Sequence, residues 1–248
     1  MTRWKLTIEY NGAPYCGWQR QDGQPSVQQH IEEAITKFCQ QDIRIHAAGR
    51  TDTGVHGRGQ VAHFDLDYGT RPLRGFDLAK ALNAHLRPEP IAIIKAEEAH
   101  PEFHARFDAK NKLYRYRIIN RTAPITTDQG FAWHFWKNLD VPAMHDTAQI
   151  LIGTHDFTTF RDSDCQAKSP VRTLSRIEVK RAGDEVIMEC EAKSFLHHQV
   201  RNMIGTLVMV GEGKWSKDDF RAALDAKDRT RGGITAPPDG LTLVRIDY

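Results

Sequence analysis

Residues 43–66 read IRIHAAGRTDTGVHGRGQVAHFDL. Two short stretches at its ends, 43–47 and 60–66, have the apolar and β-branched residues of strands. Between them runs a glycine-rich loop with glycines at positions 49, 54 and 57. Glycine adopts backbone conformations that are closed to other residues, so we expect a tight turn from which Arg50 and Asp52 project. The stretch therefore predicts a strand, a loop that presents a carboxylate, and a second strand.

The preceding residues extend this pattern. Trp4, Leu6, Ile8 and Tyr10 alternate with polar residues, the period of two of a strand with one buried face. A helix is expected after Pro25, because Ser26 and Gln29 fit a capping box and apolar residues then recur at helical spacing, at Val27, Ile31, Ala34, Ile35 and Phe38. The first half of the chain therefore reads strand, helix, strand, loop, strand.

A similar order recurs in the second half. We expect a strand near 113–119, a helix near 141–152 and strands near 174–180 and 185–192, followed by an apolar helix over 195–210 and a closing strand over 241–246. The repeated pattern predicts an α+β protein of two subdomains, residues 1–106 and 107–248, with largely antiparallel sheets that flank a central cleft holding Asp52.

Composition limits the classes of function. The net charge is only 34 − 32 = +2, so a polyanion must be met by a local basic patch. No stretch approaches the roughly 18 apolar residues of a membrane span, and the N-terminus lacks a signal-peptide pattern, so we place the chain in the cytoplasm. The four cysteines form no CxxC pair, and no HxxxH or HExxH spacing occurs. We expect neither a metal nor another cofactor.

The loop admits two readings from its spacing alone. A phosphate-binding loop is excluded, because Gly54 is followed by Val55 and His56 instead of Lys and Ser or Thr, and a strand comes next. Asp52 can simply hydrogen-bond its own turn, as aspartates in glycine-rich turns commonly do. It can also be a reactive carboxylate, and spacing does not decide between the two.

The wider sequence resembles a known family. Gly49-Arg50-Thr51-Asp52, followed by Gly54-Val55-His56 and Gly59-Gln60-Val61, looks like the catalytic loop of the tRNA pseudouridine synthase A family. Further blocks resemble that family in the same order, at 10–12 with 17–21, 165–172, 195–203 and 236–241. Several separated motifs in one order are far more specific than any one of them.

The resemblance implies a role for each matching residue. Asp52 becomes the catalytic carboxylate, Arg50 and Arg201 become basic residues of the active site, and Tyr114 becomes the aromatic that contacts the target base. Arg58, Lys168 and Arg172 lie in or next to matching blocks and are expected to bind the RNA. The implied protein is a homodimer that isomerises uridines at positions 38 to 40 of the tRNA anticodon stem-loop.

The chemistry agrees with these residue types. Pseudouridine formation breaks the bond from ribose C1′ to uracil N1 and rejoins the base through C5, so no redox carrier or nucleotide is consumed. One ionised carboxylate suffices, and the permanent charge of Arg201 would favour that form of Asp52. Arg201 could instead contact a phosphate, as most arginines near RNA do.

The strand at 113–119 places its tyrosines and arginines on opposite faces. Tyr116 is expected in the core, whereas the family match favours a pocket for Tyr114, where a ring can stack on a flipped uracil. The basic residues of this region could contact phosphate or form a solvated face; they are Arg106, Lys110, Lys112, Arg115, Arg117 and Arg121.

Two rival functions remain open at this point. A non-catalytic RNA-binding protein would keep the basic patches without needing Asp52. A base-excising glycosylase would use the same carboxylate, but the base would be lost.

Overall fold

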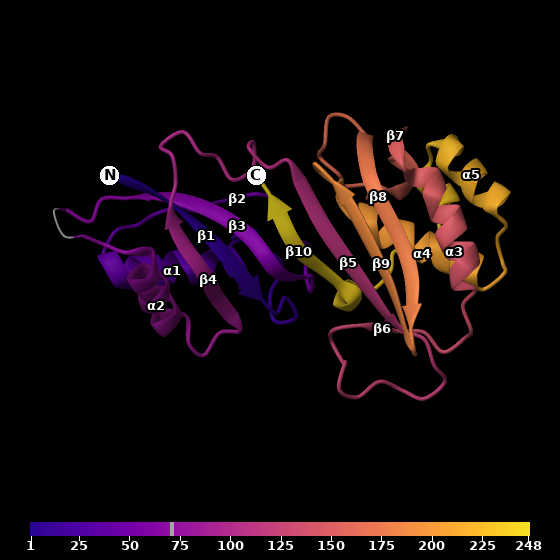
Figure 1. Ribbon diagram of the computed structural model, residues 1–248, viewed down its shortest axis with the longest axis horizontal. Coiled ribbons are helices and arrows are strands. Elements are labelled where there is room, and N and C mark those ends of the chain that lie inside the picture. Colours follow the sequence, from indigo (N-terminus) through magenta and orange to yellow (C-terminus); the bar gives the residue numbers. More distant parts are fainter. Residues whose placement is uncertain (70–71) are drawn as a thin grey trace. The chain divides into compact units, whose positions relative to one another are not determined.

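The computed structural model describes residues 1–69 and 72–248, which form two compact units (Figure 1). Unit 1 contains Met1–Lys110 and Leu243–Tyr248, and unit 2 contains Asn111–Thr242. Each unit combines helices with mostly antiparallel strands, so the predicted α+β class is confirmed. No helix among the described residues is long and apolar enough to cross a bilayer.

Unit 1 is built on strands in the order β4-β1-β3, and β10 follows β3. β1 is antiparallel to both neighbours, so Trp4 lies opposite Phe64 on one side and Glu98 on the other. The short β2 pairs with the outer part of β3 through His46 and His63. The bounds are β1 (Thr2–Tyr10), β2 (His46–Ala47), β3 (His56–Leu66), β4 (Ile91–Glu98) and β10 (Leu241–Asp247).

Helices α1 (Val27–Cys39) and α2 (Gly75–Leu86) cover one face of these strands (Figure 1). The alternation predicted for the first strand is confirmed, because its four apolar residues are all buried in this core; they are Trp4, Leu6, Ile8 and Tyr10. Ser26 caps α1 by accepting from the amide of Gln29 at 3.3 Å. The Gln29 side chain donates to Glu33 instead, so only half of the expected capping box forms.

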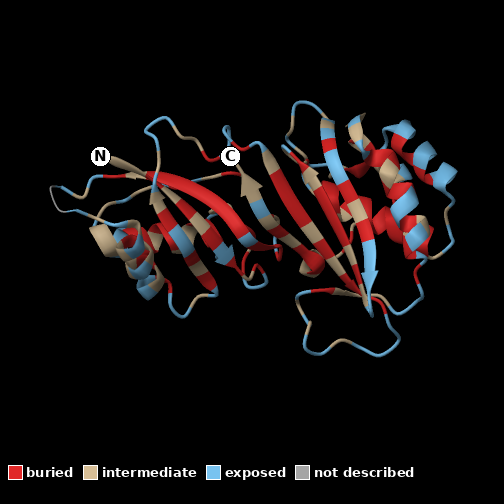
Figure 2. Ribbon diagram, in the orientation of Figure 1, coloured by how far each residue is buried: buried red, intermediate tan, exposed pale blue. Residues whose placement is uncertain are grey.

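Unit 2 has strands in the order β5-β9-β8-β7, with β6 parallel to β5. Helix α3 packs on β8 and on α4, and α5 packs against α4. The bounds are β5 (Asn111–Ile119), β6 (Trp133–His134), α3 (Val141–Ala148), β7 (Gly153–Asp156), β8 (Val171–Ala182), β9 (Glu185–Ala192), α4 (Gln199–Gly211) and α5 (Lys217–Ala226). Figure 2 shows that α4 is buried along most of its length, as are β3 and β5.

Two expected elements differ from the structure. The strand expected over 43–47 is reduced to His46–Ala47, because the Ile45 amide donates to the Glu32 carboxylate of α1 instead of joining the sheet. The helix expected to begin at 195 begins at Gln199. His198 adopts left-handed backbone angles, φ 58° and ψ 4°, which a continuing right-handed helix does not allow.

Candidate active site

The loop that carries Asp52 joins β2 to β3 in unit 1 and is held by hydrogen bonds on both sides of that residue. The Tyr10 hydroxyl lies 2.8 Å from Oγ1 of Thr51, and the Trp18 amide donates to the Thr51 carbonyl at 3.0 Å. After Asp52 the chain turns, because the Val55 amide donates to the Asp52 carbonyl at 3.1 Å. The backbone at Asp52 is therefore fixed by Tyr10 at the end of β1 and by Trp18 in the segment after β1.

The residues that hold the loop, here called the cradle, are Tyr10, Gly12, Trp18 and Gly57. The glycines among them allow the chain to approach the loop closely. A Cβ at Gly12 would lie 2.1 Å from the Val55 carbonyl oxygen, and a Cβ at Gly57 would lie 2.5 Å from Cε1 of Tyr10. Gly54 has φ 78°, a left-handed value that favours glycine. The sequence predicts conformational freedom at positions 49, 54 and 57. Only Gly54 among these uses a left-handed φ, whereas Gly57 is needed for space.

Tyr10 is the electrostatic neighbour of Asp52 in this cradle. The pKa of the Tyr10 phenol is raised to about 12, mainly by burial and in small part by the negative charge of Asp52. Hydrogen bonds with Thr51 and Gln60 act in the opposite direction. Tyr10 therefore stays protonated at neutral pH and can donate its hydroxyl hydrogen within the cradle.

The two other predicted residues of unit 1 lie beside this loop. Arg50 is exposed and stands two positions before Asp52, while Arg58 is exposed near the start of β3. Asp52 itself is half-buried. The structure thus brings all three into one short segment, in which two cations flank the carboxylate along the chain.

In unit 2, Tyr114 lies on β5 and is buried. Its ring packs edge-on against Phe195, with centroids 5.1 Å apart and planes at 84°. Phe195 belongs to the segment before α4, so this contact joins the strand of Tyr114 to the helix of Arg201. Tyr116 is fully buried, as expected.

Arg201 is positioned by the segment 236–239. Its Nε donates to the Ala236 carbonyl at 2.8 Å, and the Ala236 amide donates back to the Arg201 carbonyl at 3.2 Å. The Tyr116 hydroxyl donates to the next carbonyl, of Pro237, at 2.7 Å. Arg201 and Asp239 both act electrostatically on Tyr116, whose burial raises its pKa well above the usual value. The guanidinium of Arg201 is thus oriented by its own unit.

Lys168 lies in the loop that precedes β8, and Arg172 is the second residue of that strand. Lys168 is exposed. Nη1 of Arg172 donates to the carbonyls of Ser169 at 2.9 Å and Val171 at 2.7 Å, while its Nε is buried without a hydrogen-bond partner among the described residues. Burial lowers the pKa of this guanidinium. A desolvated cation with a spare donor is suited to an incoming phosphate.

The arginines in β5 and just after it are not available in this way. Arg115 pairs with Glu189 at 2.7 Å, and Arg117 pairs with Asp128 at 2.8 Å and with Glu185. Arg121 lies 3.5 Å from Asp184. The alternative of a phosphate-binding face along this strand is therefore not supported for these three residues, because acidic side chains of the same unit neutralise them.

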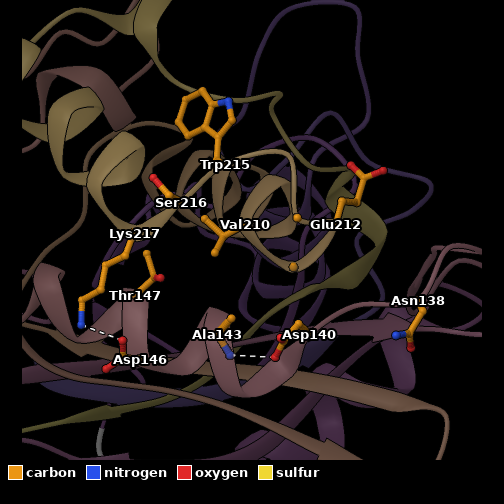
Figure 3. A pocket seen from close by; sticks show the side chains of 12 residues that line it. Asn138, Asp140, Ala143, Asp146, Thr147, Val210, Glu212, Trp215, Ser216 and Lys217 are labelled. Atoms are coloured by element: carbon orange, nitrogen blue, oxygen red, sulfur yellow. Dashed lines mark hydrogen bonds and ion pairs between the residues drawn. The ribbon is translucent and has the colours of Figure 1, made fainter.

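A separate pocket of about 490 Å³ lies between α3 and the turn that leads to α5 (Figure 3). Its carboxylates are already engaged: Asp146 pairs with Lys217 at 2.7 Å, Asp140 caps α3, and Glu212 pairs with Lys137 at 3.1 Å. None of the predicted site residues lines it. We assign it no part in the reaction.

The chain matches known proteins over most of its length. Residues 6–108 and 147–248 match the family described as tRNA pseudouridine synthase. The chain belongs to this family. It is 54% identical to tRNA pseudouridine synthase A of Rhodospirillum rubrum, over 100% of this chain and 88% of that protein. The same-named protein of Parvibaculum lavamentivorans is also 54% identical, over 100% of both chains, and that of Maricaulis maris is 52% identical, over 100% and 98%. The predicted family and the isomerase class are confirmed.

The hydrogen bonds and close packing around the Asp52 loop give three further residues a structural role that the sequence did not indicate. Tyr10, which the sequence predicts only as a buried strand residue within a matching block, holds the Asp52 loop together with Gly12 and Trp18. Long-range hydrogen bonds of this kind leave no periodic signal. The one available hint was the pair of glycines at 12 and 17, which permit close backbone approach.

Proposed function

We propose that this tRNA pseudouridine synthase isomerises uridines at positions 38 to 40 of the anticodon stem-loop, with Asp52 as its catalytic carboxylate. The observation that carries the proposal is the cradle, which fixes the backbone on both sides of a half-buried aspartate. A loop aspartate that served only as a turn former would not need such support from a separate strand.

The residue types fit a mechanism in three stages. The ionised carboxylate of Asp52 attacks the sugar or the base, or removes a sugar proton, and the bond from C1′ to N1 breaks. The base turns, and C1′ bonds to C5 as the bond between Asp52 and the sugar or base breaks, or as Asp52 returns the proton to the sugar. C5 then loses its hydrogen as a proton, and N1 takes up a proton, so the product is an isomer of the substrate. No metal and no cofactor are required by these steps.

The remaining predicted residues act on binding. Tyr114 stacks on the uracil once it leaves the RNA stack, and Arg201 contributes positive charge to the site. Arg50, Arg58, Lys168 and Arg172 contact phosphates, which dominate the affinity of proteins for RNA. The enzyme acts in the cytoplasm as a homodimer, each protomer presenting one such set of residues.

One assay separates this proposal from its rivals. The purified protein is incubated with a tRNA labelled with tritium at uridine C5, and release of the label to water is measured together with the integrity of the RNA. Release at positions 38 to 40, with every base retained, supports the isomerase. Tight binding without release would indicate a non-catalytic RNA-binding protein, and loss of the base would indicate a glycosylase.

A further inference from the structure

The segment before α4 contains a histidine held by a carboxylate. Nδ1 of His198 lies 2.5 Å from Oδ2 of Asp162. The backbone makes a second link in the opposite direction, because the Asp162 amide donates to the His197 carbonyl at 3.0 Å. The Asn202 amide donates to the His198 carbonyl at 2.9 Å and begins the helix. Asp162 thus fixes both the ring of His198 and the turn that carries it.

This bond sets the tautomer of the imidazole. Hydrogen bonds from the Asp164 amide and from His198 lower the pKa of the Asp162 carboxyl against the opposing effect of its burial. An ionised carboxylate only accepts hydrogen bonds, so Nδ1 of His198 carries the proton. In the neutral ring the lone pair then resides on Nε2. Proteins use the same carboxylate and imidazole arrangement to prepare a histidine as a base.

The backbone at His198 argues for a function of the side chain. A left-handed conformation costs a non-glycine residue about 1 kcal/mol or more, and glycine would adopt it freely. The chain nevertheless has histidine at this position, with φ 58°. Residues held in such conformations cluster at functional sites.

The position of His198 relates it to the residues already assigned to the reaction. His198 is the N-cap of α4, and Arg201 follows three residues later in the first turn of that helix. Phe195, three residues before His198, packs on Tyr114. The ring is only partly buried, with 21% of the side chain exposed. The short segment 195–201 thus carries the oriented imidazole, the predicted arginine and the ring that packs on Tyr114.

The reaction needs a base at one defined step. After C1′ bonds to C5, that carbon still carries its hydrogen, and the uracil ring regains its conjugation only when this hydrogen leaves as a proton. The electron pair of the C5–H bond restores the double bond between C5 and C6. Asp52 has by then already acted at the bond between C1′ and N1, so a second group is suited to take this proton.

We propose that His198 is the general base that removes the C5 proton, through Nε2, and that Asp162 is the residue that positions it. The inference rests on the proposed function. The proton passes from C5 to Nε2 and then to water, while N1 takes a proton from the solvent, so no atom is gained or lost. Asp162 acts through His198 and does not itself touch the substrate.

The test uses two substitutions that suit the left-handed backbone. His198→Gly removes the ring and relieves the backbone strain, so it separates a chemical role from a structural one. In His198→Asn, asparagine tolerates the left-handed conformation. Its side-chain amide keeps a hydrogen-bond donor toward Asp162 but has no basic nitrogen. We expect turnover to fall by about 100-fold or more in both variants, the usual contribution of a general base. His85→Asn, at an exposed histidine of α2, is the control and is expected to keep turnover near that of the wild type.

Two readouts distinguish catalysis from folding. With tRNA deuterated at uridine C5, the isotope effect on turnover should be larger in His198→Gly and His198→Asn than in the wild type, because proton loss from C5 becomes slower than the other steps. Added imidazole should restore part of the activity of His198→Gly. Asp162→Asn should lower turnover less than the two His198 substitutions do, because the imidazole remains. Turnover still falls, since an amide can present a donor to Nδ1 and favour the wrong tautomer of His198.

Two results would contradict the role of His198 as general base. Near-normal turnover of His198→Gly overturns the proposal, and so does a loss of turnover with an isotope effect no larger than that of the wild type. The wild-type protein is assayed first for tritium release. If the wild type releases none, the proposed function fails, whatever the variants do. If the wild type is active, the variants test His198 alone.

Discussion

The phenol oxygen of Tyr10 lies 2.8 Å from Oγ1 of Thr51, the residue immediately before Asp52. Both side chains are buried, so this bond is shielded from water. It connects the end of β1 to the loop that carries the carboxylate, across 41 residues of sequence. The placement of Asp52 therefore depends on a strand that contributes no group to the chemistry.

Replacing Tyr10 by phenylalanine tests this dependence. The change leaves the buried Thr51 hydroxyl without its partner, which costs about 1–3 kcal/mol in the free energy of unfolding. Turnover should fall by about tenfold, the equivalent of 1.4 kcal/mol in the barrier, because Asp52 is less well held, while tRNA affinity stays constant. Urea unfolding and tritium release measure the two effects. Tyr68→Phe, at a half-buried ring stacked on Phe38, is the control and should change neither.

Gly57→Ala tests the same cradle through its packing. The new Cβ would meet the Tyr10 ring at 2.5 Å, so the ring or the strand must move, at a cost of about 1–3 kcal/mol. We expect lower stability together with lower turnover. Gly183→Ala is the matched control, because Gly183 has φ 60° and open space around it. That variant should lose about 1 kcal/mol through backbone strain alone and keep its turnover. Equal turnover in both variants would contradict a role for the cradle.

Tyr114→Ala should reduce the rate far more than it reduces affinity for tRNA. Phosphate contacts dominate affinity, whereas the ring acts on one extruded base. Tyr114→Phe keeps the ring and its packing on Phe195, so it should retain most of the rate. Single-turnover kinetics and filter binding at one salt concentration give the two quantities. A parallel loss of rate and affinity would mean that Tyr114 serves only the fold.

The sequence predicted those elements whose signal is local. The alternation in β1 and the cap of α1 depend on neighbouring residues, and both are confirmed. The strand expected over 43–47 was wrong over most of its length, because a single buried carboxylate, Glu32, takes the amide of Ile45. No pattern within residues 43–47 encodes that competition. The predicted subdomains, residues 1–106 and 107–248, stay a prediction.

The candidate site divides in the same way. The resemblance indicated Asp52, Tyr114 and Arg201, because those residue types stand in matching blocks. It did not reveal Tyr10 behind Thr51, or Asp162 against His198, since each pair joins segments that are distant in sequence. Such pairs follow from tertiary packing and cannot be found by period or spacing.

Acid should destabilise unit 1 through His63. The pKa of His63 is lowered to about 4, mainly by burial and further by the positive charges of His104, His46 and Arg3, against a smaller opposing effect of Asp65. In the unfolded chain the pKa of a histidine is about 6.5, so between these values the unfolded state binds the proton that the folded state excludes. Stability from this group is therefore complete above pH 6.5 and falls as the pH is lowered toward 4, by up to about 3 kcal/mol.

His63→Asn separates this effect from the titration of other groups. Nδ1 of His63 accepts from the Ala105 amide at 3.2 Å, and the asparagine oxygen can replace it without taking up a proton. Urea unfolding at pH values from 7.5 to 4.5 should give a smaller loss of stability for the variant than for the wild type. Parallel curves would show that His63 does not titrate in this range.

The decisive substitution is Asp52→Asn, which replaces the carboxylate by a neutral amide of nearly the same shape. An amide is a poor nucleophile and a poor base, so essentially all turnover should be lost. Binding should survive, because basic residues hold the tRNA, and removal of one negative charge beside phosphates favours a slightly tighter complex. The fold should also survive, since the hydrogen bonds to this loop engage Thr51 and the Asp52 backbone. Asp42→Asn, at an exposed aspartate of the same unit, is the control and should behave like the wild type. If Asp52→Asn folds, binds and still forms pseudouridine near the wild-type rate, Asp52 is only a turn former and the catalytic assignment is wrong.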